Sequence, residues 1–89
     1  VLSVLEVQVE RVPGTLAECR ARFRQVADAA GAEFGVHPIA AQGPGGQRLG
    51  VDSARLGSER PRRGLVVMSG VHGVEGFIGS ALQCGLVER

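Results

Sequence analysis

The chain has 89 residues, a formal net charge of +1, two Cys, three Phe, and neither Trp nor Tyr. A chain of this size forms at most one small domain and buries only about 60 to 65% of the surface that its unfolded form exposes. Acidic and basic residues are interspersed without a basic stripe, and no apolar run approaches the roughly 18 residues of a membrane span. We therefore expect no nucleic-acid partner and no membrane partner.

Residues 1–12 alternate only weakly between apolar and polar side chains, and we treat them as a leader of unclear structure. They contain Glu6 within the apolar stretch and no basic region, so they do not resemble a signal peptide. We therefore expect a cytoplasmic protein. Cys19 and Cys84 lack any C-x-x-C spacing, and we expect two small buried thiols in place of a disulfide.

Residues 15–30 show the strongest helical pattern in the chain. Thr15 and Glu18 have the S/T-x-x-E spacing of a capping box, in which each side chain accepts from the backbone N–H of the other residue. Gly31 follows where a helix commonly ends in a glycine. The apolar positions that form one stripe are Leu16, Cys19, Phe23, Val26 and Ala30.

The next part of the chain predicts a hairpin. Residues 33–40 read as a strand that ends near Pro38, because a proline belongs at a strand end or sheet edge. Residues 42–47 contain three Gly and one Pro and predict a turn or flexible loop, after which residues 48–56 return as a second strand. Polar residues then predict a surface loop over residues 57–64, with a solvated cluster of Arg60, Arg62 and Arg63.

Residues 65–68 form a continuous apolar run, which predicts a strand buried on both faces. A helix is expected over residues 77–87. Its predicted apolar face consists of Phe77, Ala81, Leu82 and Leu86.

Between the predicted strand and helix, His72 and Glu75 stand three residues apart in a run of glycines. Imidazole nitrogen and carboxylate oxygen are both zinc ligands, and the backbone between two such ligands must turn for both to reach one ion. Gly70, Gly73 and Gly76 permit such a turn and a close approach to the backbone. A catalytic zinc also needs a third protein ligand and an open position for water.

Other interpretations of this loop remain open. H-x-x-E is a common pattern, and a surface His and Glu near a helix N-terminus would also produce it. The spacing G-x-x-G-x-x-G differs from the G-x-G-x-x-G of nucleotide-binding turns, and Glu75 would repel a phosphate. His37 is the only other histidine, and as a third ligand it would have to reach the far end of a neighbouring strand.

Residues 69–81 (S-G-V-H-G-V-E-G-F-I-G-S-A) resemble the S-G-T-H-G-V-E-G-F-x-G-S-A signature of a bacterial family of unknown function, DUF2817. Val71 stands where the family usually has Thr. Residues 17–23 resemble the first helix of that family. The segment from Gly31 through the glycine-rich turn to the Arg-Pro-Arg loop resembles its usual opening. The likeness covers residues 14–89.

The resemblance implies a place in the zinc carboxypeptidase-like (M14-type) metallohydrolase clan, whose aspartoacylase and succinylglutamate desuccinylase members share a similar G-x-H-G-x-E form. It implies that His72 and Glu75 are the first two ligands of a Zn²⁺ ion. It also implies an α/β fold, in which residues 13–89 are the N-terminal portion of a three-layer α/β/α sandwich with a mixed sheet. In the clan, a downstream His, Glu and Arg act as third ligand, general base and carboxylate-binding group, and we expect their counterparts beyond residue 89.

We therefore expect part of a zinc-dependent hydrolase of the carboxypeptidase or deacylase type, which cleaves an amide or peptide bond. By analogy with the clan, the substrate would be a small molecule or peptide with a free carboxylate. The 89 residues alone are expected to be inactive. The alternative is a non-catalytic truncated or split product that acts only with a missing C-terminal partner.

Overall fold

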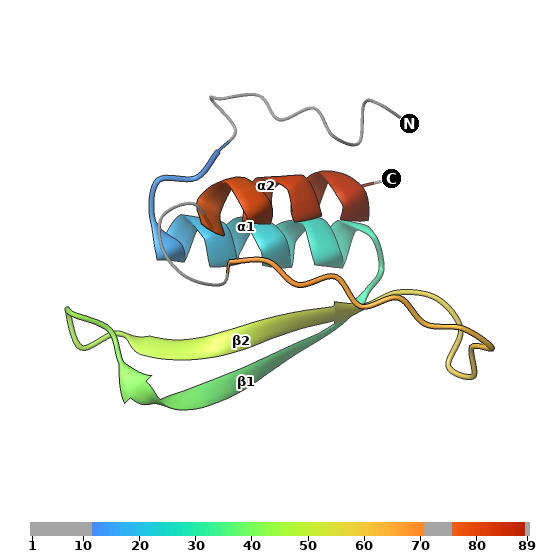
Figure 1. Cartoon of the computed structure of the whole chain (residues 1–89), viewed down its shortest axis with the longest axis horizontal. Helices are drawn as coiled ribbons and strands as arrows, with labels where there is room; N and C mark the ends of the chain where they lie inside the picture. The colour runs from blue at the N-terminus through green and yellow to red at the C-terminus, as the bar shows by residue number, and fades with distance from the viewer. Residues whose placement is uncertain (1–11, 71–75, 89) are drawn as a thin grey trace.

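The computed structural model describes residues 12–70 and 76–88. Two helices and two strands follow one another in the order α1 (Leu16–Ala29), β1 (Glu33–Gln42), β2 (Arg48–Arg55) and α2 (Gly76–Val87) (Figure 1). The chain therefore has the mixed α and β content that the sequence predicts. Within the described ranges, no helix has the length and apolar character needed to cross a bilayer.

The start of α1 is capped by two side chains. Thr15 adopts an extended conformation, and its Oγ1 accepts a hydrogen bond from the backbone N–H of Glu18 at 3.1 Å. Glu18 Oε2 accepts from the backbone N–H of Gly14 at 2.9 Å, one residue before the predicted donor. Both side chains thus cap the helix as expected, but the carboxylate reaches one residue further back than in the predicted box.

The end of α1 depends on Gly31, which has a φ of 73°. Its N–H donates to the carbonyl of Asp28 at 3.1 Å, and the N–H of Ala32 donates to the carbonyl of Ala27 at 2.9 Å. These two bonds form a Schellman motif, which satisfies carbonyls that the helix leaves without an internal partner. Only glycine adopts this φ at little cost, so the predicted role of Gly31 is confirmed.

β1 and β2 form an antiparallel two-stranded sheet in which Val36 lies opposite Asp52 and Pro38 opposite Gly50. The predicted turn is present: the N–H of Gly46 donates to the carbonyl of Gly43 at 2.9 Å. Pro38 lies within β1, which continues to Gln42, so the predicted strand end near this proline is too early. Each strand of a two-stranded sheet has a free edge, where a missing N–H costs no ladder bond.

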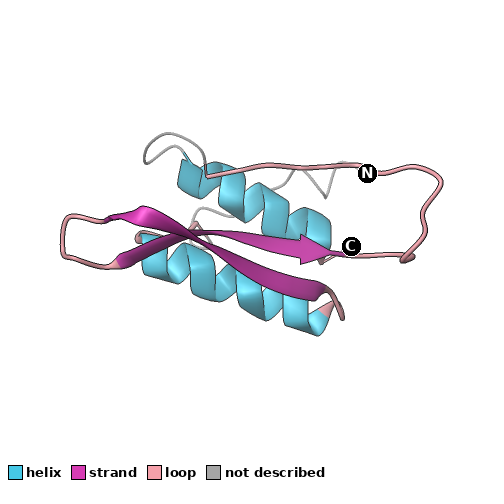
Figure 2. Cartoon of the chain, turned by 90° about the horizontal axis from the view of Figure 1, so that it is seen from below, coloured by secondary structure: helices cyan, strands magenta, loops and turns pink. Residues whose placement is uncertain are grey.

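The two helices lie on the same side of the hairpin, with α1 directly behind the strands (Figures 1 and 2). They lie side by side and run in the same direction (Figure 1). Phe23 of α1 meets Phe34 of β1 with 6.0 Å between ring centroids and 49° between ring planes. The Arg24 guanidinium lies 4.8 Å from the centre of the Phe34 ring. This aromatic contact joins the helix layer to the hairpin.

The core of the described residues is small. Its buried apolar side chains are Cys19, Val26, Ala27 and Cys84. Both cysteines are free, as predicted. Burial raises the pKa of the Cys84 thiol, and the positive charge of Arg22 lowers it by a smaller amount.

The predicted stripe on α1 is only partly correct. Leu16 is 42% exposed and Ala30 is also exposed, while Ala27, outside the stripe, is fully buried. A single stripe assumes one packing partner, whereas α1 packs against both α2 and β1 and therefore buries two sides.

Residues 65–68 do not form the predicted buried strand. Leu65 and Val66 are 85% and 84% exposed, and Met68 is 77% exposed. The segment lies along α2, but it is not part of the described sheet, which contains β1 and β2 alone. A strand needs a hydrogen-bonding neighbour, and the described residues place none beside this segment.

A paired arginine and aspartate connect α1 to β2. Arg20 Nε donates to Asp52 Oδ2 at 2.7 Å, and Nη2 donates to Oδ1 at 2.6 Å. The two side chains are 30% and 10% exposed. Gly50 lies close to β1 beside this pair: a Cβ there would lie only 3.1 Å from the carbonyl oxygen of His37, and at an ordinary contact distance of 3.5 Å from Arg20 Nη2.

Replacing Asp52 with Asn should therefore destabilise the fold. The change leaves a partly buried guanidinium without its charged partner, and we expect the free energy of unfolding to fall by about 1 to 3 kcal/mol. Urea unfolding followed by circular dichroism measures the loss. The matched control is Asp28→Asn, because Asp28 and Arg24 form an exposed pair at 3.8 Å. This control should cost at most about 0.5 kcal/mol. Equal losses in the two variants would show that the Arg20–Asp52 pair has no special role.

Candidate functional site

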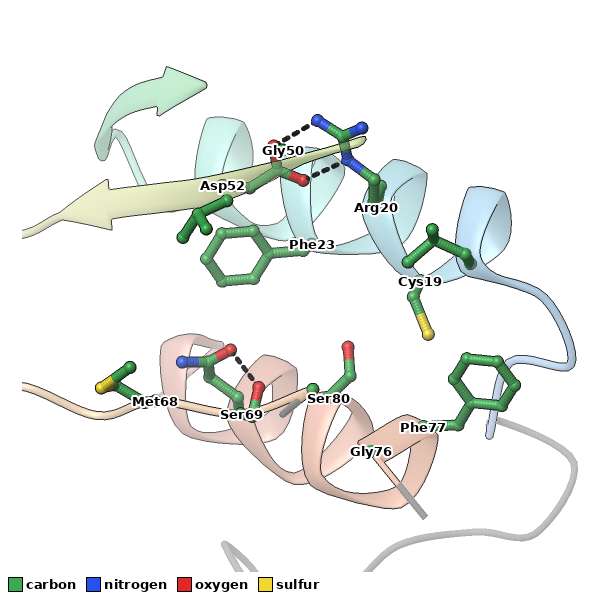
Figure 3. Close-up of a pocket in the computed structure, with 14 residues that line it drawn as sticks. Cys19, Arg20, Phe23, Gly50, Asp52, Met68, Ser69, Gly76, Phe77 and Ser80 are labelled. Carbon is green, nitrogen blue, oxygen red and sulfur yellow. Dashed lines mark hydrogen bonds and ion pairs between the residues drawn. The ribbon is translucent and has the colours of Figure 1, made fainter. Parts of the chain in front are cut away.

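A groove of about 620 Å³ lies between β2 and the segment that precedes α2 (Figure 3). Gly50 to Asp52 of β2 form one wall, and residues 68–70 form the other. α1 contributes Cys19 and Phe23, and α2 contributes Phe77. The volume falls within the range of about 300 to 1,000 Å³ that small-molecule sites occupy.

The predicted zinc ligands His72 and Glu75 lie outside the described residues. The structure does describe the residues on either side of them. Gly70 and Gly76 both line the groove, so the chain enters and leaves residues 71–75 at the groove. Gly70 has a φ of 72°, a conformation that suits glycine and turns the chain at this point.

A glutamine side chain fixes the segment that leads to this loop. Ser69 Oγ donates to Gln83 Oε1 at 2.6 Å, and Gln83 Nε2 donates to the backbone carbonyl of Val67 at 2.8 Å. The amide of one α2 residue therefore holds two points of the extended segment (the Ser69–Gln83 bond is drawn in Figure 3). Sequence reasoning missed Gln83, because a single glutamine in a helix carries no recognisable pattern.

The ionisable groups of the groove are already partnered or neutral. The hydrogen bond between Arg20 and Asp52 raises the pKa of Arg20, so the guanidinium stays charged. Two of its nitrogens donate hydrogen bonds to the Asp52 carboxylate. Burial raises the pKa of the Cys19 thiol, and a hydrogen bond with Ser80 opposes this only in part. Cys19 is therefore a poor nucleophile and a poor metal ligand at neutral pH, because both roles need the thiolate.

His37 does not face the groove. Phe34 of the same strand contacts Phe23 of α1, and residues three apart in a strand point to opposite faces. His37 therefore lies on the outer face of the hairpin, where its Nε2 is hydrogen-bonded to Ser53 Oγ at 3.0 Å. Among residues 12–70 and 76–88, no group of three His, Cys, Asp or Glu side chains could hold a metal ion.

Replacing Gln83 with Met should loosen the segment before the loop. Methionine has a similar length but makes neither hydrogen bond, so the backbone order parameters of residues 67–70 should fall toward the flexible range below about 0.6. Relaxation measurements on ¹⁵N-labelled protein test this. The matched control is Gln25→Met on the exposed side of α1, which should leave these values unchanged. An unchanged segment in the Gln83 variant would show that the amide does not hold it.

The comparisons with known proteins agree with the sequence on the family. The model of the family described as "Protein of unknown function (DUF2817)" matches residues 14–89. No curated protein and no solved structure matches the chain. The predicted family is confirmed by this match, while its relation to the zinc carboxypeptidase-like clan stays a prediction. The match covers most of the 89 residues, and the chain therefore belongs to the DUF2817 family.

Proposed function

We propose that this chain contributes two ligands, His72 and Glu75, to the zinc site of a hydrolase that cleaves an amide or peptide bond. The observation that carries the proposal is the place of the loop: residues 71–75 begin and end at the 620 Å³ groove. A metal site at the edge of a cavity of this size would have room beside it for a small substrate.

The chemistry of the loop fits zinc. Imidazole nitrogen and carboxylate oxygen are both ligands that zinc accepts. Glu75 directly precedes Gly76, the first residue of α2. The turn at Gly70 lets the backbone change direction before the first ligand. A zinc ion held there would lower the pKa of a bound water to about 7 and polarise the scissile carbonyl.

The described residues would bind and orient the substrate. The apolar side chains of Leu16, Phe77 and Met68 line the groove and would exclude water from a bound molecule. Arg20 is committed to Asp52, so a substrate carboxylate would need a different cation. A third metal ligand and a general base are also required, and we expect both beyond residue 89. Among the described residues, no group of three His, Cys, Asp or Glu side chains could hold the ion. The 89 residues alone should therefore not turn over substrate.

We also propose that these elements belong to a three-layer α/β/α sandwich of the zinc carboxypeptidase-like type. Both helices cover one face of the hairpin (Figure 2). The opposite face carries Val51 and Ile39, which are 55% and 49% exposed. A second helix layer would remove these apolar side chains from water, and this supports the three-layer arrangement.

Zinc binding by the 89-residue chain is a direct test of the ligands. With two protein ligands, we expect weak binding in competition with a chromophoric chelator, and His72→Ala or Glu75→Gln should each reduce the affinity at least about tenfold. The control is His37→Ala, which removes the only other histidine and should change nothing. Binding that survives His72→Ala but is lost in His37→Ala would place the metal elsewhere.

Hydrolysis is tested on the natural gene product that contains these residues. It should release the amino acid from N-acyl amino acids or short peptides, lose activity with a chelator, and regain it with zinc. Glu75→Gln should lower the rate of hydrolysis at least about 10²-fold, because the zinc ion that activates the attacking water loses one of its ligands. Zinc binding without turnover of any such substrate would favour the non-catalytic alternative.

A further inference from the structure

The loop that follows β2 carries three arginines in a setting unlike that of the others. Within the described ranges, every other arginine lies in α1 or β2. Residues 57–64 are all exposed and belong to no helix or strand, and this loop extends away from the helices and the hairpin (Figure 1). Its arginines are Arg60, Arg62 and Arg63, none of which forms an ion pair within the described part of the chain.

The loop is held near its start and is open near its end. The N–H of Arg60 donates to Ser58 Oγ at 3.1 Å, and Arg55 Nη1 donates to the carbonyl of Ser58 at 3.4 Å. A Cβ added to Gly64 would meet nothing within 4 Å, so the peptide bond between Arg63 and Gly64 lies in open space. Exposed loops of this kind are where endoproteases cut folded proteins.

We propose that residues 60–63 are the recognition segment of an endoprotease with acidic subsites, which cuts the chain between Arg63 and Gly64. A guanidinium and a carboxylate meet in a planar arrangement of two hydrogen bonds, so Asp or Glu in the subsites would bind Arg63 and the preceding Arg62. The reaction is hydrolysis. Water supplies the hydroxyl of the new Arg63 carboxyl group and the hydrogen of the new Gly64 amine.

Pro61 restricts which bond of the loop is cut. The bond between Arg60 and Pro61 is a poor substrate, because its nitrogen belongs to the proline ring and carries no hydrogen. A cut between Arg62 and Arg63 would leave one guanidinium on the far side of the bond, away from the acidic subsites. A cut before Gly64 keeps all three arginines on the recognised side and has the smallest residue on the other.

The loop stays available if the sheet is larger than the described hairpin. Further strands of the mixed sheet proposed above would lie along the free edge of β2 or beside residues 65–70, and a second helix layer would cover the outer face of the strands. The loop begins after Arg55, the last residue of β2, which is opposite Glu33 at the end of the paired register. It therefore lies beyond the end of the paired strands, away from their edges.

Cleavage would divide the groove between two polypeptides. β2, which forms one wall, would remain with α1, whereas residues 68–70 of the other wall would remain with α2. The packing of α1 on α2 and the ion pair of Arg22 with Glu88 at 3.1 Å would still connect the two parts. The cut would thus loosen one wall relative to the other without removing a groove residue. The proposal does not depend on zinc.

A polyanion is the other partner that three exposed arginines could attract. Glu59 beside Arg60 opposes this attraction, and residues 57–64 contain no aromatic side chain that could stack on a nucleic-acid base. A polyanion responds to the charges alone, whereas a protease also requires a bond that it can hydrolyse. Gly64→Pro separates the two cases, because it keeps every charge and removes the N–H at the bond that is cut. The open space around Gly64 accommodates the ring.

Limited digestion of the 89-residue chain with trypsin tests whether the loop is accessible to a protease. Mass spectrometry should find the first cuts after Arg62 or Arg63, at least about tenfold faster than after any arginine of α1 or β2, because those bonds require local unfolding first. Cuts in α1 or β2 at an equal or higher rate would overturn the proposal.

Terminal-peptide analysis of the gene product isolated from its natural host tests whether the site is used. A fraction of the protein should begin at Gly64, and Gly64→Pro should abolish that terminus. The matched control is Arg48→Gln, which removes an exposed arginine from β2 and should leave the cut fraction within about twofold of the original. If no terminus at Gly64 is found, the proposal is wrong. Binding of polyphosphate by the uncut chain, equal in the Gly64→Pro variant, would then identify a polyanion as the partner.

Discussion

The paired charges of Arg20 and Asp52 are the constraint on which the arrangement of this small domain depends. Four buried apolar side chains are too few to determine how a helix lies on a hairpin. The two hydrogen bonds of the pair fix both the distance and the rotation between α1 and β2, because a guanidinium and a carboxylate meet in one plane. They also fix one wall of the groove, since Asp52 and Gly50 belong to it.

Features that arise between neighbours in the chain could be predicted from the sequence. The cap at Thr15, the left-handed glycine at Gly31 and the turn before β2 each involve residues no more than five positions apart. Their chemistry is carried by a few residue types at set spacings, so a single sequence is enough to find them. The free, buried state of the two cysteines followed in the same way from their isolated positions.

Features that join distant parts of the chain could not be predicted. Arg20 and Asp52 are 32 positions apart, and Gln83 reaches back 16 positions to Val67. No spacing rule connects such pairs. The apolar run at residues 65–68 shows the reverse problem: its composition is typical of a buried strand, but burial depends on neighbours that the described residues do not supply. The same distinction holds for the candidate site: the sequence predicted the His72 and Glu75 motif, but only the fold reveals the groove beside it.

The exposed apolar run at residues 65–68 also bears on association between copies of the chain. Its four residues are Leu, Val, Val and Met, uncharged and without proline, and such segments stack into intermolecular sheets when left open. The loop just before it carries Arg60, Arg62 and Arg63, all exposed, with Pro61 among them. In-register stacking of this segment would bring rows of like charges together and would require a proline in each layer. Like charges and a proline placed directly before an exposed apolar run disfavour this kind of stacking, in the way that gatekeeper residues do.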